Sequence, residues 1–177
     1  MKLFKNIKKW LENQAHLFYL FLLILIVPNI ILCFTEPMPI VAKVCNVLLP
    51  FAFYYLLMTL SRNSGKMFWI LFLFIFFGAF QIVLLYLFGQ SIIAVDMFLN
   101  LVTTNSSEAM ELLDNLVPAL VSVIILYIPA LILAAISIIK KRKLSLEFIR
   151  RERDKAWIAL LIGFISLGAA YGLDKRY

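Results

Sequence analysis

Apolar residues occur along this chain in long continuous runs, unlike the short alternating segments of soluble proteins. A helix needs about 20 such residues to cross roughly 30 Å of hydrocarbon, and five runs are close to that length. They cover residues 16–34, 40–60, 67–89, 117–139 and 156–172, of which the last is the shortest. Strands of a membrane barrel would instead alternate polar and apolar residues. The pattern therefore predicts an all-α integral membrane protein, a bundle of five transmembrane helices.

Three of the five runs carry a proline in their interior, at Pro28, Pro50 and Pro129. Proline removes one backbone donor and its ring clashes with the preceding turn, which kinks a helix. Neighbouring helices in a membrane bundle compensate for such kinks. We therefore expect these three helices to be kinked and packed against neighbours.

The composition excludes a water-soluble domain. Hydrophobic residues make up 64% of the 177 positions, and mean hydropathy is +0.97, whereas soluble domains are nearer half apolar. The net charge of +7 could indicate nucleic-acid binding, but the cations lie in short segments between the runs, so we expect no nucleic-acid partner. His16 is the only histidine, and without a Cys/His cluster around it we expect no metal site in this chain.

The Lys and Arg residues indicate the orientation, because cytoplasmic loops retain cations. Fourteen of the 17 fall in three segments, residues 1–15, 61–66 and 140–155, whereas residues 90–116 contain none. We therefore expect a cytoplasmic N-terminus and, after five crossings, a C-terminus on the outer side. The basic segment 140–155 has two interpretations: a helix lying along an anionic leaflet, or a solvated loop.

The two cysteines, Cys33 and Cys45, lie at the outer ends of the first two expected helices, which a short link joins. A disulfide between them is geometrically conceivable. Two unbridged cysteines inside apolar helices are the commoner outcome. The sequence leaves both alternatives open.

Residues 96–116 form a distinct outer segment, with four carboxylates and no Lys or Arg. In a helix, Asn100, Thr104 and Glu108 follow one another at intervals of four and so share one stripe. We expect an amphipathic outer helical segment between the third and fourth transmembrane helices. Its stripe could hold a small cationic headgroup with its phosphate: Glu108 would attract the amine, and Asn100 and Thr104 would donate hydrogen bonds to oxygens.

The alternative is that a helix simply begins inside this segment. Residues 103–107 are Thr, Asn and Ser residues that suit helix starts better than helix interiors. Asn105 as N-cap with Glu108 three positions on would form a capping box. A helix that breaks there would interrupt the polar stripe.

The string DMFLNLVTTNSSEAMELL, residues 96–113, resembles the outer segment of the N-terminal membrane domain of the lipid A phosphoethanolamine transferases. That family includes the mobile colistin-resistance enzymes. The shared pattern falls, with the same spacing, on Met97, Asn100, Thr104, Glu108 and Ala109. A weaker match is an Arg and a Lys four residues apart before the third helix, at Arg62 and Lys66.

The resemblance implies a function that this chain could perform only in part. Such enzymes, in the bacterial inner membrane, transfer phosphoethanolamine from phosphatidylethanolamine to a sugar phosphate of lipid A, which is linked to polymyxin resistance. Asn100, Thr104 and Glu108 would help to bind the donor lipid on the periplasmic side. In that family a periplasmic domain with zinc ligands and a threonine nucleophile follows the fifth helix, whereas this sequence stops at Tyr177. We therefore assign no catalytic residue and no cofactor within it.

A second interpretation is a freestanding noncatalytic membrane protein, either an assembly partner or a small transporter subunit. Transporters place polar or charged groups inside their transmembrane helices as a pathway. This sequence offers few candidates for such a pathway, Asn46 and Gln81 among them. The outer motif favours the transferase domain, and the second class stays open.

Overall fold

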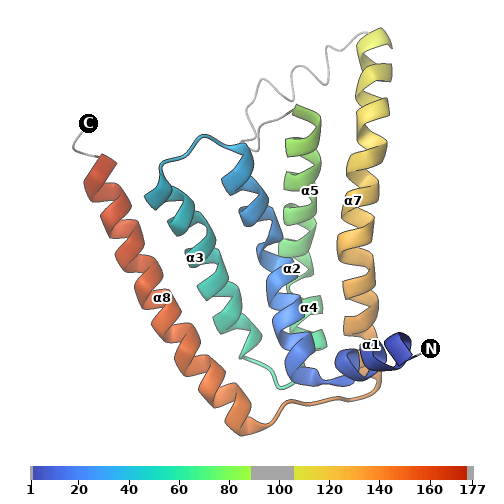
Figure 1. Ribbon diagram of the computed structural model, residues 1–177, viewed down its shortest axis with the longest axis vertical. Helices are drawn as coiled ribbons and strands as arrows, with labels where there is room; N and C mark the ends of the chain where they lie inside the picture. Colours follow the sequence, from blue (N-terminus) through green and yellow to red (C-terminus); the bar gives the residue numbers. More distant parts are fainter. Residues whose placement is uncertain (1, 89–105, 175–177) are drawn as a thin grey trace.

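The structure, a computed structural model, describes residues 2–88 and 106–174, and all regular secondary structure in these ranges is helical (Figure 1). The helices are α1 (Lys2–Glu12), α2 (Gln14–Thr35), α3 (Ile40–Met58), α4 (Ser64–Ile70), α5 (Phe72–Phe88), α7 (Ser106–Ile139) and α8 (Leu146–Asp174). The predicted all-α fold is therefore confirmed for the described residues. Predictions that concern residues 89–105 lie outside this description.

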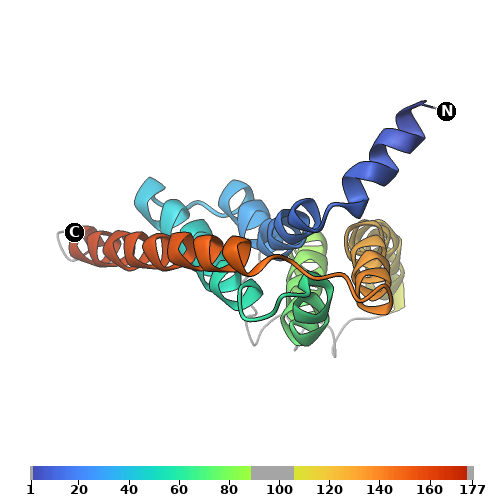
Figure 2. The same cartoon turned by 90° about the horizontal axis from the view of Figure 1, so that it is seen from below.

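The long helices stand side by side in one row, in the order α8, α3, α2, α5 and α7 (Figures 1 and 2). The short α4 lies between α5 and the end of the molecule where α1 lies, and it packs against α7. Helix α8, at one end of the row, runs beside α3, and in its first turns the ring of Phe148 also packs against Phe18 and Tyr19 of α2. Its side chains Leu161 and Ile165 are 63% and 64% exposed, as expected of apolar side chains that face hydrocarbon instead of a protein core.

Four helices are long and apolar enough to cross a membrane: α2, α3, and the parts of α7 and α8 over Val117–Ile139 and Leu146–Gly172. Helices α4 and α5 are long and apolar enough for a fifth span only if they are taken together. The two are bent by 63° at a short break. The third expected helix, residues 67–89, is thus a bent pair of helices. The chain is compatible with a multi-pass membrane protein of four or five crossings.

A close contact between α4 and α7 accounts for the bend. A Cβ atom added at Gly65 would lie 2.3 Å from the carbonyl oxygen of Ala134, so only glycine permits this approach. Asn63 caps α4 by accepting from the Lys66 amide at 2.8 Å, and its Nδ2 donates to the carbonyl of Arg142 at 2.8 Å. These contacts hold α4 against α7, and the direction of the chain changes at Leu71.

The core lies around α2, the central helix of the row. Phe18, Phe21, Met58 and Phe68 are fully buried, and they come from α2, α3 and α4. The rings of Phe21 and Phe68 stack with their centroids 4.6 Å apart. Together these side chains fill the half of the row nearer to α1, where the helices converge (Figure 1).

Helix α8 begins ten residues earlier than the expected 156. Leu146 is its first residue, and the hydroxyl of Ser145 accepts from the Phe148 amide at 3.1 Å, which caps the helix. The expected basic loop over 140–155 is therefore confined to residues 140–145. The reason is an apolar face: Ile149 and Ala156 are buried at helical spacing in the first turns of α8.

Both cysteine thiols are free. The Cys33 thiol donates to the carbonyl of Lys43 at 3.4 Å and accepts from Nδ2 of Asn46 at 3.5 Å. Cys45 is buried inside α3. Of the two alternatives left by the sequence, the structure has the unbridged pair.

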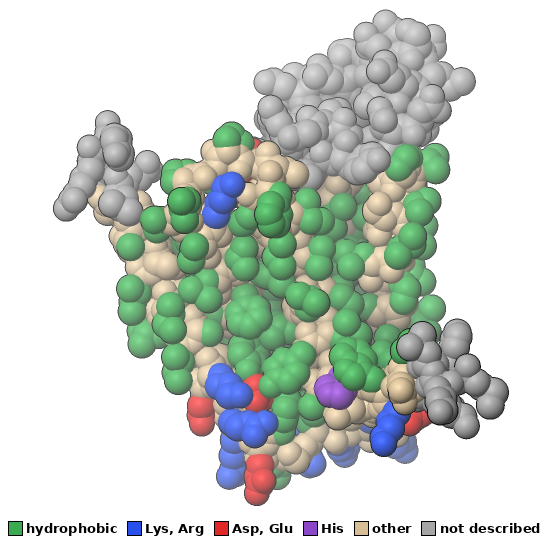
Figure 3. All heavy atoms as spheres, in the orientation of Figure 1, with side chains coloured by type: hydrophobic (Ala, Val, Ile, Leu, Met, Phe, Trp, Pro, Cys, Tyr) green, Lys and Arg blue, Asp and Glu red, His purple; other side chains and the backbone are tan. Residues whose placement is uncertain are grey.

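Charged side chains gather at one end of the molecule in Figure 3, the end that carries α1 and the links α3–α4 and α7–α8. The band between the two ends is covered by hydrophobic side chains in the same view. We call the charged end the basic end. The opposite end contains the start of α7 and the link between α2 and α3 (Figure 1).

Candidate functional sites

The predicted donor-lipid residues are only partly within the described chain. Asn100 and Thr104 lie outside it, as does the alternative N-cap Asn105. Glu108 is the third residue of α7, and its backbone is helical. It lies at the end of α7 farthest from the basic end (Figure 1). Residues 106–116 continue without a break into the span of α7, so this part of the expected outer segment is not a separate helix.

A buried carboxylate near the basic end is the most completely bonded polar group among the described residues. Glu152, in the second turn of α8, has a fully buried side chain. It lies in line with Ile149 and Ala156 on the face that packs against the row. An isolated ionised carboxylate would be very costly at such a place, so its partners decide what it does.

Two tyrosines from two other helices supply the partners of one carboxylate oxygen. The hydroxyl of Tyr19, in α2, donates to Oε2 of Glu152 at 2.7 Å. The hydroxyl of Tyr55, in α3, donates a short hydrogen bond to the same oxygen. Tyr55 is itself buried, whereas the side chain of Tyr19 reaches the surface. Glu152 thus joins α8 both to its neighbour α3 and to α2 beyond it.

Cations supply the partners of the other oxygen. Arg151 Nε and Lys155 Nζ lie 3.1 Å and 3.0 Å from Oε1 of Glu152, and their side chains are 65% and 53% exposed. Exposed ion pairs contribute little by themselves, but here they neutralise a buried charge that would otherwise lack a counter-ion. The neighbouring Arg153 donates to the carbonyl of Thr59 at 3.2 Å, a second link from α8 to the end of α3.

The Glu152 cluster suits a structural role. Four donors surround its two oxygens, so no lone pair is left to take a proton from a substrate without breaking an existing bond. Its bonds instead fix the first turns of α8 against α2 and α3. The carboxylate therefore holds α2, α3 and α8 together.

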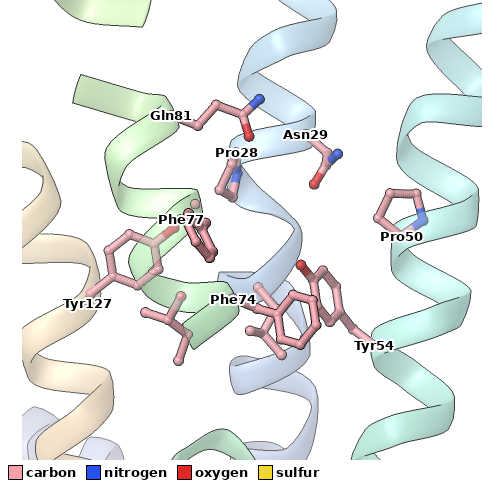
Figure 4. Close-up of a pocket in the computed structure, with 11 residues that line it drawn as sticks. Pro28, Asn29, Pro50, Tyr54, Phe74, Phe77, Gln81 and Tyr127 are labelled. Atoms are coloured by element: carbon pink, nitrogen blue, oxygen red, sulfur yellow. The ribbon is translucent and has the colours of Figure 1, made fainter. Parts of the chain in front are cut away.

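A second feature is a cavity of about 200 Å³ in the middle of the row, lined by parts of α2, α3, α5 and α7 (Figure 4). Pro28 and Pro50 lie in its wall, so the two helix-weakening residues of α2 and α3 meet at one place. Gly78 lies beside them, where a Cβ atom would be 3.1 Å from Cγ of Pro28 and 3.2 Å from the hydroxyl of Tyr127. The wall is otherwise largely aromatic.

Three polar side chains of the cavity wall lack hydrogen-bond partners among the described residues. The side chains of Tyr54, Gln81 and Tyr127 make no hydrogen bond to another described residue, although all three line the cavity. A polar cavity of this size holds water or a small neutral hydrogen-bonding molecule. None of the residues that line it is charged, which makes it a poor site for an ion and a weak support for a transport pathway.

At the cavity wall, the amide of Asn29 is paired with that of Asn46 and joins α2 to α3. Nδ2 of Asn46 donates to the carbonyl oxygen of Asn29 at 3.1 Å, and Nδ2 of Asn29 donates to Oδ1 of Asn46 at 3.3 Å. The carbonyl of Asn29 belongs to the turn after Pro28. Asn46, named at the sequence level as a possible pathway residue, is thus occupied in helix packing.

Within the described residues, no three His, Cys, Asp or Glu side chains lie close enough to bind a metal ion. His16 stacks on the ring of Trp10 with centroids 4.8 Å apart, and its Nδ1 lies 3.1 Å from the carbonyl oxygen of Trp10. The single histidine therefore takes part in a turn between α1 and α2.

Comparison with known proteins found no matching family model, no matching curated protein and no matching solved structure.

The Glu152 cluster was not predicted, because both interpretations of residues 140–155, a helix along the leaflet and a solvated loop, left its charged residues at the membrane surface. A signal was present: Ile149, Glu152 and Ala156 recur at intervals of three and four, which is the spacing of one helix face. An acid in line with two apolar residues, among many cations, indicates a buried carboxylate with basic neighbours. The tyrosine partners, more than 90 residues away in the sequence, could not have been found in this way.

Proposed function

We propose that this chain is the membrane domain of a phosphoethanolamine transferase of the bacterial inner membrane. In this role it anchors the enzyme and helps to bind phosphatidylethanolamine, the donor lipid, for transfer to lipid A. The observation that carries the proposal is the spacing of Asn100, Thr104 and Glu108 between Met97 and Ala109. The catalytic step would belong to a periplasmic domain outside this sequence, and zinc would be bound there.

The part of α7 that follows Glu108 enters an apolar layer. Val117 lies nine positions after Glu108, which is about 14 Å along a helix. From Val117 onward, α7 carries exposed apolar side chains: Val117 is 61% exposed and Ile124 is 53% exposed. At 100° per residue these two side chains lie on the side of α7 opposite to Glu108, so they indicate how far Glu108 is from the hydrocarbon and not the path of the acyl chains of a lipid bound there.

The charge distribution supports the orientation that the proposal requires. The link α7–α8 contains Lys140, Lys141, Arg142 and Lys143, and the start of α7 lies at the opposite end of the molecule. Cation-rich loops remain in the cytoplasm. With the basic end in the cytoplasm, Glu108 and the end of α8 are periplasmic, where donor lipid and catalytic domain would meet.

Headgroup selectivity tests the proposal. The purified chain, in nanodiscs of phosphatidylcholine, is titrated with a short-chain phosphatidylethanolamine and with its trimethylated counterpart, phosphatidylcholine of the same chain length. We expect saturable binding of the ethanolamine lipid only. Its ammonium group can donate hydrogen bonds to a carboxylate and to neutral oxygens, whereas the three methyl groups of the choline headgroup replace these N–H donors. Equal binding of both lipids would contradict a donor-lipid site. It would favour the second interpretation, a freestanding noncatalytic membrane protein.

A further inference from the structure

Helix α1 lies outside the row of helices. In Figure 1 it runs across the direction of α2, and in Figure 2, viewed from below, it points away from the other helices. It contacts α2 alone among the described helices. Its length is therefore parallel to the plane in which the surface of a bilayer would lie at the basic end.

The sequence of α1 is strongly amphipathic. Its apolar residues are spaced by three and four, which places them on one face of a helix; they are Leu3, Phe4, Ile7, Trp10 and Leu11. The remaining positions are polar, and four of them are lysines: Lys2, Lys5, Lys8 and Lys9. Ile7 and Trp10 are 49% and 45% exposed, so these two residues of the apolar face have no protein cover, whereas Leu11, next to α2, packs against the core.

The turn after α1 fixes this direction. The Trp10 carbonyl accepts from the amide of Asn13 at 3.2 Å, and Asn13 caps α2 by accepting from the Ala15 amide at 3.0 Å. The stacked His16 ring holds Trp10 from the first turn of α2. Arg142, from the link α7–α8, reaches the carbonyl oxygen of Glu12 at 3.4 Å. Helix α1 is thus held at its C-terminal end by two other parts of the basic end.

We propose that α1 is a membrane-surface helix that binds anionic phospholipids of the leaflet at the basic end. Its apolar face, with Ile7 and Trp10, enters the boundary between headgroups and acyl chains, and its lysines contact lipid phosphates. Charge complementarity selects this partner: α1 carries four lysines and a single acid, Glu12. A helix with a high proportion of lysine on its polar face and an aromatic residue on the other is typical of interfacial helices. The inference does not depend on the transferase proposal.

Fluorescence of Trp10 in the full chain tests this inference. The other two tryptophans are replaced in W69F/W157F, and the protein is reconstituted into vesicles of phosphatidylcholine with or without phosphatidylglycerol. Phosphatidylcholine brominated at shallow or deep chain positions serves as quencher. With phosphatidylglycerol present, we expect blue-shifted Trp10 emission and stronger quenching by the shallow bromines. Each lysine near an anionic surface contributes about fivefold to binding, so the combined K2Q/K5Q/K8Q/K9Q variant should lose most of this quenching.

Two controls separate charge from fold. The same four positions changed to Arg keep the charge and should keep the quenching, whereas K140Q/K141Q/K143Q removes charge elsewhere at the basic end and should leave Trp10 unaffected. Circular dichroism of each variant checks that the helices remain. Red-shifted, unquenched emission in both lipid mixtures would overturn the inference, because α1 would then lie in water. Equal quenching with and without phosphatidylglycerol would overturn the anionic partner.

Discussion

The hydroxyl of Tyr19 lies 2.7 Å from Oε2 of Glu152, a residue 133 positions later in the chain. Tyr55 donates to the same oxygen from a third helix. This arrangement matters because α8 stands at the end of the row, beside α3, and meets α2 only through side chains of its first turns. Without Glu152, the first turns of α8 would be held to the row by apolar contacts and by Arg153.

The first prediction concerns the tyrosine bonds. Tyr55→Phe removes one donor from a buried carboxylate, and a hydrogen bond to a charged group is worth about 1.5–3 kcal/mol, so the free energy of unfolding should fall by that amount. Tyr54→Phe is the matched control, because the Tyr54 hydroxyl bonds to no other described residue. Unfolding in mixed micelles with increasing sodium dodecyl sulfate measures both. Equal losses for the two variants would contradict the assigned hydrogen bond.

The second prediction concerns the charge of Glu152. Glu152→Gln keeps the size of the side chain but removes the charge that Arg151 and Lys155 balance. It also places an amide NH2 group, a donor, against groups that donate to the carboxylate. Removing one partner of a buried ion pair costs about 3–5 kcal/mol, and we expect the lower part of this range because both cations can turn to solvent. Glu147→Gln, an exposed acid of the same helix, should change stability by less than about 0.5 kcal/mol. Similar thermal unfolding of both variants would rule out the structural role.

The third prediction concerns two glycine-to-alanine substitutions that should change the free energy of unfolding in opposite directions. Gly65→Ala would place a Cβ 2.3 Å from the Ala134 carbonyl oxygen, so α4 and α7 must separate, at a cost of about 1–3 kcal/mol. Gly168→Ala, in α8, meets no atom within 4 Å and should stabilise the helix by about 0.5–1 kcal/mol. The unfolding midpoints of the two variants check this difference. A neutral Gly65→Ala would show that α4 and α7 are less close than described.

The fourth prediction concerns topology. A phosphatase reporter that is active only outside the cytoplasm should be active when fused after Tyr177 and inactive when inserted within residues 140–145. The reason is that cation-rich loops stay in the cytoplasm, and an odd number of crossings places the C-terminus on the other side. An active reporter within residues 140–145 would overturn the orientation. An inactive reporter after Tyr177 would show an even number of crossings, with α4 and α5 not forming one span.

The sequence predicted those features that depend on continuous local patterns. Apolar runs predicted α2, α3, α7 and the membrane part of α8, since a helix satisfies its own backbone in lipid. The bend at Leu71 escaped prediction because it results from contact of Gly65 with Ala134, far away in the chain. The early start of α8 escaped because charged residues concealed its apolar face. In the donor-lipid stripe, Asn100 and Thr104 stay predictions.

The most direct test of the account is the effect of Glu108 on binding of the donor lipid. Glu108→Gln keeps the side-chain size but removes the charge that would pair with the ammonium group, and a charge-assisted contact of about 1.5–3 kcal/mol corresponds to a loss of roughly tenfold to a hundredfold. Asp114→Asn removes a carboxylate charge further along α7 and lies beyond the matched string, residues 96–113. Titration of each variant with short-chain phosphatidylethanolamine gives the two dissociation constants. The account predicts the loss for Glu108→Gln alone; wild-type binding by Glu108→Gln, or equal losses in both variants, would contradict the donor-lipid site.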